Sequence, residues 1–159
     1  MSTDPAAVDL GSLGDLRSAF RAAPDPSVAD LVGRFEAEFI GPGWMRAGGP
    51  VLMWLGRMPG WCGKRFEYAD GTTESLVGAN LVRKDGAVRD SVPITAAMAR
   101  SQMDGRPALL VSYPKDAPFP WPRVADELRP FGEGVLLGMT FGIPLTPPGG
   151  NPFLLRRTP

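Results

Sequence analysis

The chain has 159 residues, 43% of them hydrophobic and 21% charged, which indicates a folded domain with one core and excludes a disordered chain. Seventeen basic residues balance seventeen acidic ones without a run of like charge, so we expect neither a nucleic-acid partner nor a membrane partner. With no histidine and one cysteine, the sequence excludes His-bearing catalytic triads, His-ligated metals and an intrachain disulfide.

Two further absences concern location and cofactors. The N-terminal region lacks the apolar core of a signal peptide, and no apolar run reaches membrane-spanning length, so we expect a cytoplasmic protein. No glycine-rich loop joins a predicted strand to a predicted helix, so we expect no nucleotide cofactor. We assign no other cofactor and no metal.

The N-terminal part predicts a disordered stretch followed by two short helices. We expect residues 1–10 to be disordered and residues 11–159 to form one β-barrel domain. Apolar residues recur at helical spacing over residues 11–22, which predicts the first helix. A Pro-rich break ends it, and a second, short helix is predicted over residues 27–32.

The next segment changes from helical spacing to alternation. Phe35, Ala37 and Phe39 alternate with charged residues, which predicts a half-buried strand. A helix through Phe39 is the alternative, because apolar residues also recur there at helical spacing. Residues 44–59 predict a loop whose apolar middle, residues 51–55, forms either a strand or a short helix.

A run of strands follows. The 20 glycines and 18 prolines favour short strands joined by turns over long helices. Asp-Gly pairs at residues 85–86 and 104–105 predict hairpin turns. The four consecutive antiparallel strands that we predict span residues 61–68, 76–83, 88–97 and 108–114.

The C-terminal part predicts one short crossover helix and two more strands. Pro122 early and Pro130 as a stop delimit a helix over residues 121–129. Strands follow at residues 134–143 and 152–157. The predicted fold is therefore mainly β: a closed antiparallel barrel of about 7–9 strands, because closure removes the exposed edges of such apolar strands. A two-sheet sandwich is the alternative.

The segment Gly60-Trp61-Cys62-Gly63-Lys64-Arg65-Phe66 resembles small uncharacterised barrel domains with a Gly-Trp-x-Gly-Lys-Arg-Phe segment and, more broadly, lipocalin-like (calycin-type) barrels. Lipocalins open with Gly-x-Trp on the first strand, and a late Arg packs over that ring. Here Gly33-Arg34-Phe35 takes the place of that motif, with Phe instead of Trp, and Arg156 or Arg157 as the late Arg. The resemblance implies a barrel with an interior cavity, and it transfers no catalytic residues.

The segment around Lys64 also supplies the candidate site. Strict alternation puts Lys64 on one strand face with Cys62, Phe66 and Tyr68, and Trp61 on the other. A core strand whose charged ends reach water is the alternative reading of these residues. The candidate ligand-binding residues are Trp61, Lys64, Phe66, Tyr68, Asn80, Tyr113, Met139 and Phe141.

Two functions compete for such a cavity. In one, the barrel binds a small, largely apolar organic molecule. In the other, it is a cofactor-independent cyclase or isomerase of a specialised metabolite, in which Lys64, Asn80 and Tyr113 polarise a carbonyl while the cavity holds the substrate in a reactive conformation. A filled barrel that serves as an interaction domain is the alternative to both. The sequence does not decide the oligomeric state.

Overall fold

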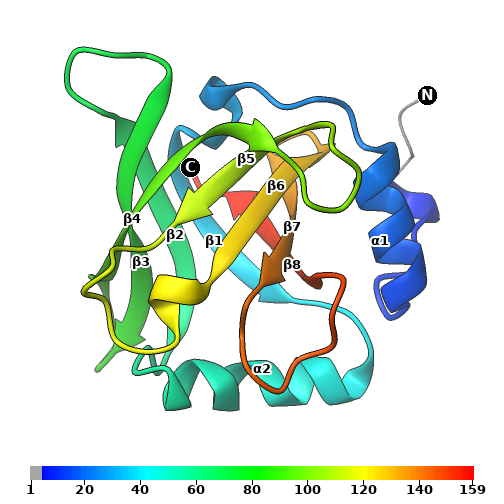
Figure 1. Ribbon diagram of the computed structural model, residues 1–159. Helices are drawn as coiled ribbons and strands as arrows, with labels where there is room; N and C mark the ends of the chain where they lie inside the picture. The colour runs from blue at the N-terminus through cyan, green and yellow to red at the C-terminus, as the bar shows by residue number, and fades with distance from the viewer. Residues whose placement is uncertain (1–4) are drawn as a thin grey trace.

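The computed structural model describes residues 5–159 and shows a closed barrel of eight antiparallel strands, which confirms the predicted fold class (Figure 1). Each strand is hydrogen-bonded to the next in the sequence, and β8 closes on β1. The strands are β1 (Gly33–Phe39), β2 (Trp61–Tyr68), β3 (Ser75–Lys84), β4 (Ala87–Arg100), β5 (Pro107–Ser112), β6 (Ala125–Gly132), β7 (Val135–Phe141) and β8 (Asn151–Arg157).

Within residues 5–159, two α-helices and three short 3-10 helices accompany the barrel. Helix α1 (Leu13–Ala22) begins where the Ser12 side chain accepts a hydrogen bond from the backbone N–H of Asp15. Helix α2 (Gly43–Leu55) connects β1 to β2. The 3-10 helices are Pro5–Ala7, Val28–Leu31 and Trp121–Arg123. No helix in the described part of the chain is both long and apolar enough to span a bilayer.

The predicted disordered region, residues 1–10, falls only partly within the described structure. Residues 1–4 lie outside the described residues. Pro5–Ala7 forms a 3-10 turn, and Val8 and Leu10 pack against a core cluster that includes residues of α1. The first helix and the short helix after it lie where the sequence predicts them.

Helix α2 resolves the open choice in the segment before β2. The sequence predicted a loop over residues 44–59 with a strand or a short helix in its middle, whereas the helix spans Gly43–Leu55 and includes Pro50. Its apolar residues are distributed around the helix and only Met53 is buried, so no single face marks it in the sequence. Figure 1 shows α2 crossing one end of the barrel.

The helix predicted over residues 121–129 is mostly wrong. Only Trp121–Arg123 is helical, as one 3-10 turn, and Ala125–Gly132 is strand β6. The alternation that would mark a strand is missing because β6 is buried on both faces, including Asp126 and Arg129. Buried charges of this kind depend on partners elsewhere in the chain, which local periodicity does not reveal.

The core has three parts. Inside the barrel, one cluster fills the end nearest the 3-10 helix Val28–Leu31 and includes Leu31, Phe35 and Phe66. Outside the barrel wall, α1 packs Leu16 and Phe20 against residues of β7 and β8. A third cluster, which contains Met53, Met58, Trp121 and Val124, lies beneath α2. The interior therefore divides into a filled end and an end that α2 covers.

Candidate functional site

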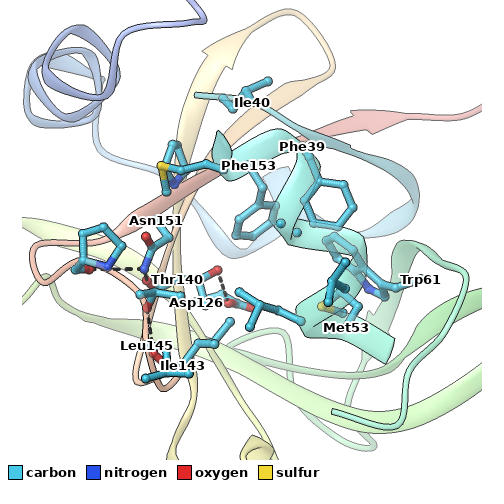
Figure 2. Close-up of a pocket in the computed structure, with 18 of the residues that line it drawn as sticks. Phe39, Ile40, Met53, Trp61, Asp126, Thr140, Ile143, Leu145, Asn151 and Phe153 are labelled. Atoms are coloured by element: carbon cyan, nitrogen blue, oxygen red, sulfur yellow. Dashed lines mark hydrogen bonds between the residues drawn. The ribbon is translucent and has the colours of Figure 1, made fainter. Parts of the chain in front are cut away.

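A cavity of about 380 Å³ lies between the barrel interior and α2, a size suited to one small organic molecule (Figure 2). Its walls are mostly apolar, and they combine residues of α2 with residues of the strands and of the loop between β7 and β8. The apolar lining residues labelled in Figure 2 are Phe39, Ile40, Met53, Ile143, Leu145 and Phe153. The polar lining residues used below are Trp61, Lys64, Tyr113, Asp126, Thr140 and Asn151.

Trp61 reaches this cavity because of a β-bulge. The register between β2 and β3 shifts between Trp61 and Gly63, so Cys62 is an extra residue without a partner on β3. The bulge reverses the alternation at this point, and Trp61 lines the cavity together with Lys64. The sequence-based expectation that Trp61 and Lys64 lie on opposite faces is therefore wrong.

Gly63 allows the two strands to approach closely just before Lys64. A Cβ at this position would lie 2.0 Å from the backbone oxygen of Phe35 on β1, a distance that no side chain tolerates. A glycine is therefore required between the bulge and Lys64. This requirement gives a structural reason for the glycine before Lys64 in the Gly-Trp-x-Gly-Lys-Arg-Phe segment.

Lys64 is the centre of a buried hydrogen-bonded group that we call the Lys64 cluster; its members are Trp61, Lys64, Asn80, Tyr113, Asp126 and Thr140. The Lys64 Nζ lies 2.7 Å from Asn80 Oδ1, 2.9 Å from the Tyr113 hydroxyl and 3.1 Å from Asp126 Oδ2. The side chains of Lys64 and Asp126 are 1% and 3% exposed, so this ion pair is removed from water. Burial at this level is costly unless both charges are fully paired.

The remaining members complete that pairing. The Tyr113 hydroxyl donates to Asp126 Oδ2 at 2.8 Å, and the Thr140 hydroxyl donates to Asp126 Oδ1 at 2.8 Å. The Trp61 indole N–H donates to Asn80 Oδ1 at 3.0 Å, and the Asn80 amide donates to the backbone oxygen of Val92. The Lys64 cluster is thus a satisfied network that links β2, β3, β6 and β7.

Burial also shifts the protonation of two members. Desolvation lowers the pKa of Lys64, and the neighbouring charge of Asp126 opposes that effect. The pKa of Tyr113 is raised well above its ordinary value, first by desolvation and then by the Asp126 carboxylate. Tyr113 therefore stays a neutral hydrogen-bond donor across the physiological range.

The structure brings four of the candidate residues together and adds two. Trp61, Lys64, Asn80 and Tyr113 meet in the Lys64 cluster, although Asn80 itself does not line the cavity. Sequence analysis missed Asp126 and Thr140 as members. Asp126 was placed on a predicted helix, and Thr140 gives no local signal because its partner lies on the adjacent strand.

The other four candidates lie away from the cavity. Phe66 is buried in the cluster at the filled end of the barrel. Tyr68 is 40% exposed. Met139 and Phe141 belong to the cluster that packs against α1 outside the barrel wall. None of the four is among the lining residues.

Arg129 forms a second buried charged group, at the other face of β6 from Asp126. Its guanidinium is fully buried and forms two hydrogen bonds with Asp104, at 2.7 and 2.8 Å. It also lies 4.5 Å from the Phe20 ring centroid of α1 and donates to the backbone oxygen of Phe20. These contacts fix α1 on the barrel, so Arg129 has a structural role here. The pKa of Asp104 falls to about 2 because of its hydrogen bonds with Arg129.

Arg157 packs over the first strand. Its guanidinium lies 4.8 Å from the Phe35 ring centroid, and it donates to the backbone oxygens of Asp30 and Val32. Arg156, the other candidate for this role, instead forms an exposed pair with Glu38. The hydrogen bonds of Arg157 join the 3-10 turn before β1 to the end of β8.

Metal-ligating groups do not gather in the described residues: no three Cys, Asp or Glu side chains are placed to hold a metal ion. The thiol of Cys62 is partly buried at the bulge.

Comparison with known proteins informs the fold alone. No protein-family model matches the chain, and no curated protein matches it. Among solved structures, the chain is similar to a crystal structure of a protein from Thermomonospora curvata, with a TM-score of 0.65 and 18% sequence identity. The similarity covers 93% of this chain and 88% of that chain, so the two share the barrel along nearly their whole length.

Proposed function

We propose that the barrel binds one small, largely apolar organic molecule in the cavity beneath α2. The observation that carries the proposal is the combination of an apolar wall of sufficient size with a small polar group at its base, the Lys64 cluster. A barrel that only supports an interaction surface gains nothing from leaving such space unfilled, because unfilled apolar volume costs stability.

The surroundings of the cavity support this proposal. Trp44 and Val51 of α2 and Leu145 of the β7–β8 loop line the cavity and are 62%, 56% and 100% exposed. Large apolar side chains at the rim of a cavity gain burial when an apolar ligand enters. The rim therefore favours an apolar guest over an ion.

The lipocalin-like resemblance is consistent with the same proposal. The order of eight strands is that of an up-and-down barrel, an architecture that encloses small ligands in lipocalins. Arg157 packs over Phe35 as the late Arg of lipocalins packs over the ring of their first strand. A cytoplasmic location and the lack of nucleic-acid or membrane partners stay predictions from the sequence.

A cofactor-independent cyclase or isomerase is the second candidate. Lys64 and Tyr113, whose pKa values shift in opposite directions, lie at the base of the cavity, and such groups are common in catalytic sites. Polarisation of a substrate carbonyl would need a free donor on Lys64 or Tyr113. The donors of both residues are already directed at other members of the Lys64 cluster, which argues against this kind of catalysis. Simple binding is therefore the function that the geometry supports best.

Native mass spectrometry of the protein purified from its own host tests the proposal. We expect one small molecule per chain, released on denaturation. The released molecule and its chemical relatives are then incubated with the protein. Chemical conversion of any of them would favour the cyclase or isomerase over simple binding. An empty protein that no panel of apolar compounds stabilises against heat would contradict ligand binding and favour an interaction domain.

A further inference from the structure

The polar side chains that line the cavity differ in how well they are hydrogen-bonded. The donors at its base are paired, whereas one acceptor, on Asn151, has no partner. Among the described residues, Oδ1 of Asn151 is a buried side-chain atom that lacks a hydrogen-bond partner. Asn151 is the first residue of β8, and it lines the cavity. A buried acceptor without a partner is costly and calls for a specific explanation.

The orientation of the Asn151 amide is fixed by its neighbours. Its nitrogen lies 3.3 Å from the backbone oxygen of Thr140 and 3.4 Å from that of Pro147. Both neighbours only accept hydrogen bonds, so the NH₂ group must face them and the oxygen must face away. Figure 2 shows these two hydrogen bonds and the oxygen on the opposite side of the amide.

The donors at the cavity base are fully used. The Lys64 ammonium donates hydrogen bonds to Asn80 Oδ1 and to the Tyr113 hydroxyl, and it forms an ion pair with Asp126 Oδ2. The other side-chain donors there are also paired: Trp61 with Asn80, Tyr113 and Thr140 with Asp126, and Asn151 with two backbone oxygens. A carbonyl or carboxylate that enters would find no free side-chain donor at this base.

We propose that the cavity selects apolar molecules that carry a hydroxyl or N–H group, which donates a hydrogen bond to Asn151 Oδ1, over anions of the same size. The proposal rests on the function proposed above and narrows its ligand class. The Asp126 carboxylate, which also lines the cavity, already compensates the charge of Lys64, so the cavity base offers an anion no uncompensated positive charge.

Matched probes test the proposal without knowledge of the natural ligand. The affinities of 1-naphthol and 2-naphthol are measured by calorimetry against their methyl ethers, which keep the ring and the oxygen but lack the donor, and against 2-naphthoate. We expect at least one naphthol to bind roughly 5- to 20-fold more tightly than its ether. We expect 2-naphthoate to bind more weakly than either naphthol.

The Asn151→Leu variant assigns the preference to this residue. Leucine has a similar size and no acceptor, so the naphthol should lose its advantage while the ether keeps its affinity or gains. Equal affinity of naphthol and ether for the wild-type protein would overturn the proposal even if the variant does not fold, and so would tightest binding of 2-naphthoate.

The outcomes separate this inference from the proposed function. Equal, saturable binding of naphthols and ethers overturns donor selection and leaves a ligand-binding cavity in place. Absence of binding by every probe counts against the cavity function as well as against donor selection. A preference for naphthol that persists in Asn151→Leu overturns the assignment to Asn151.

Discussion

The Lys64 ammonium on β2 and the Asp126 carboxylate on β6 lie 3.1 Å apart, and they join two strands that are four positions apart in an eight-stranded barrel. The pair therefore connects opposite walls through the interior. Both side chains are almost fully buried, so each charge depends on the other for compensation.

The first prediction concerns this pair. Lys64→Met should lower the free energy of unfolding by roughly 3 kcal/mol or more, because it leaves the Asp126 carboxylate buried without a counter-charge. Lys64→Met combined with Asp126→Asn should recover part of the loss, since both sites are then neutral. Urea unfolding of the two single variants and the double variant measures the coupling, and strictly additive losses would contradict it.

The second prediction compares two adjacent arginines. Arg157→Ala should destabilise the protein by about 1–2 kcal/mol, because it removes the contact with Phe35 and the hydrogen bonds to backbone oxygens. Arg156→Ala removes only an exposed pair with Glu38 and should cost about 0.5 kcal/mol or less. Thermal unfolding of both variants checks the difference, and equal effects would show that the Phe35 contact has no stabilising role.

The third prediction concerns acid stability. The pKa of Asp104 is about 2 in the folded protein, below its ordinary value of 3.8, because Arg129 stabilises the carboxylate. The group therefore stabilises the fold above pH 4, and this stabilisation is lost as the pH falls through the folded pKa. Asp104→Asn should be less stable than wild type at pH 7, by roughly 1–3 kcal/mol.

The pH profile provides the control for that prediction. The difference in unfolding free energy between wild type and Asp104→Asn should shrink between pH 4 and pH 2, as wild type takes up a proton. A difference that is constant over this range would mean that Asp104 titrates alike in the folded and unfolded chains.

Local pattern predicted the hairpin strands around the Asp-Gly turns well, because the signals that specify them are local, whereas it missed β6. The Asp85-Gly86 turn has positive φ at both residues, as its Asp-Gly sequence predicts, and the strands beside it are close to their expected bounds. The strand face on which Trp61 lies could not be predicted from local pattern alone. A bulge at Cys62 is set by pairing with β3, and alternation within β2 carries no trace of it.

The site was only half predictable for a similar reason. Asn80 was a candidate because a buried amide in an apolar strand needs a hydrogen-bond partner, and in the structure its oxygen accepts from Lys64 and Trp61. Asp126 is also a buried polar residue, but the neighbouring charges Glu127 and Arg129 made the segment look like a solvated helix. Those charges find their partners in the loop between β4 and β5, which only the closed barrel brings near.

The fourth prediction tests the bulge. Cys62→Ala should leave the free energy of unfolding within about 0.5 kcal/mol of wild type, because the change removes only one free, partly buried thiol. Deletion of Cys62 should convert the bulge into regular pairing and leave Trp61 two positions before Lys64, on the same strand face as Lys64. Trp61 should then still face the cavity, so its fluorescence maximum should stay close to that of wild type, whereas a shift to the red would contradict the register described here.

The most direct test of the ligand-binding cavity is a fluorescence titration with N-phenyl-1-naphthylamine, an apolar probe, on three proteins. Leu52 of α2 lines the cavity, whereas Leu55 on the same helix is 62% exposed and does not. We predict saturable binding at one site in wild type and Leu55→Trp, and a loss of at least roughly tenfold in affinity in Leu52→Trp, whose indole fills the cavity. Binding that Leu52→Trp leaves unchanged, or no binding by wild type, would contradict a ligand site beneath α2.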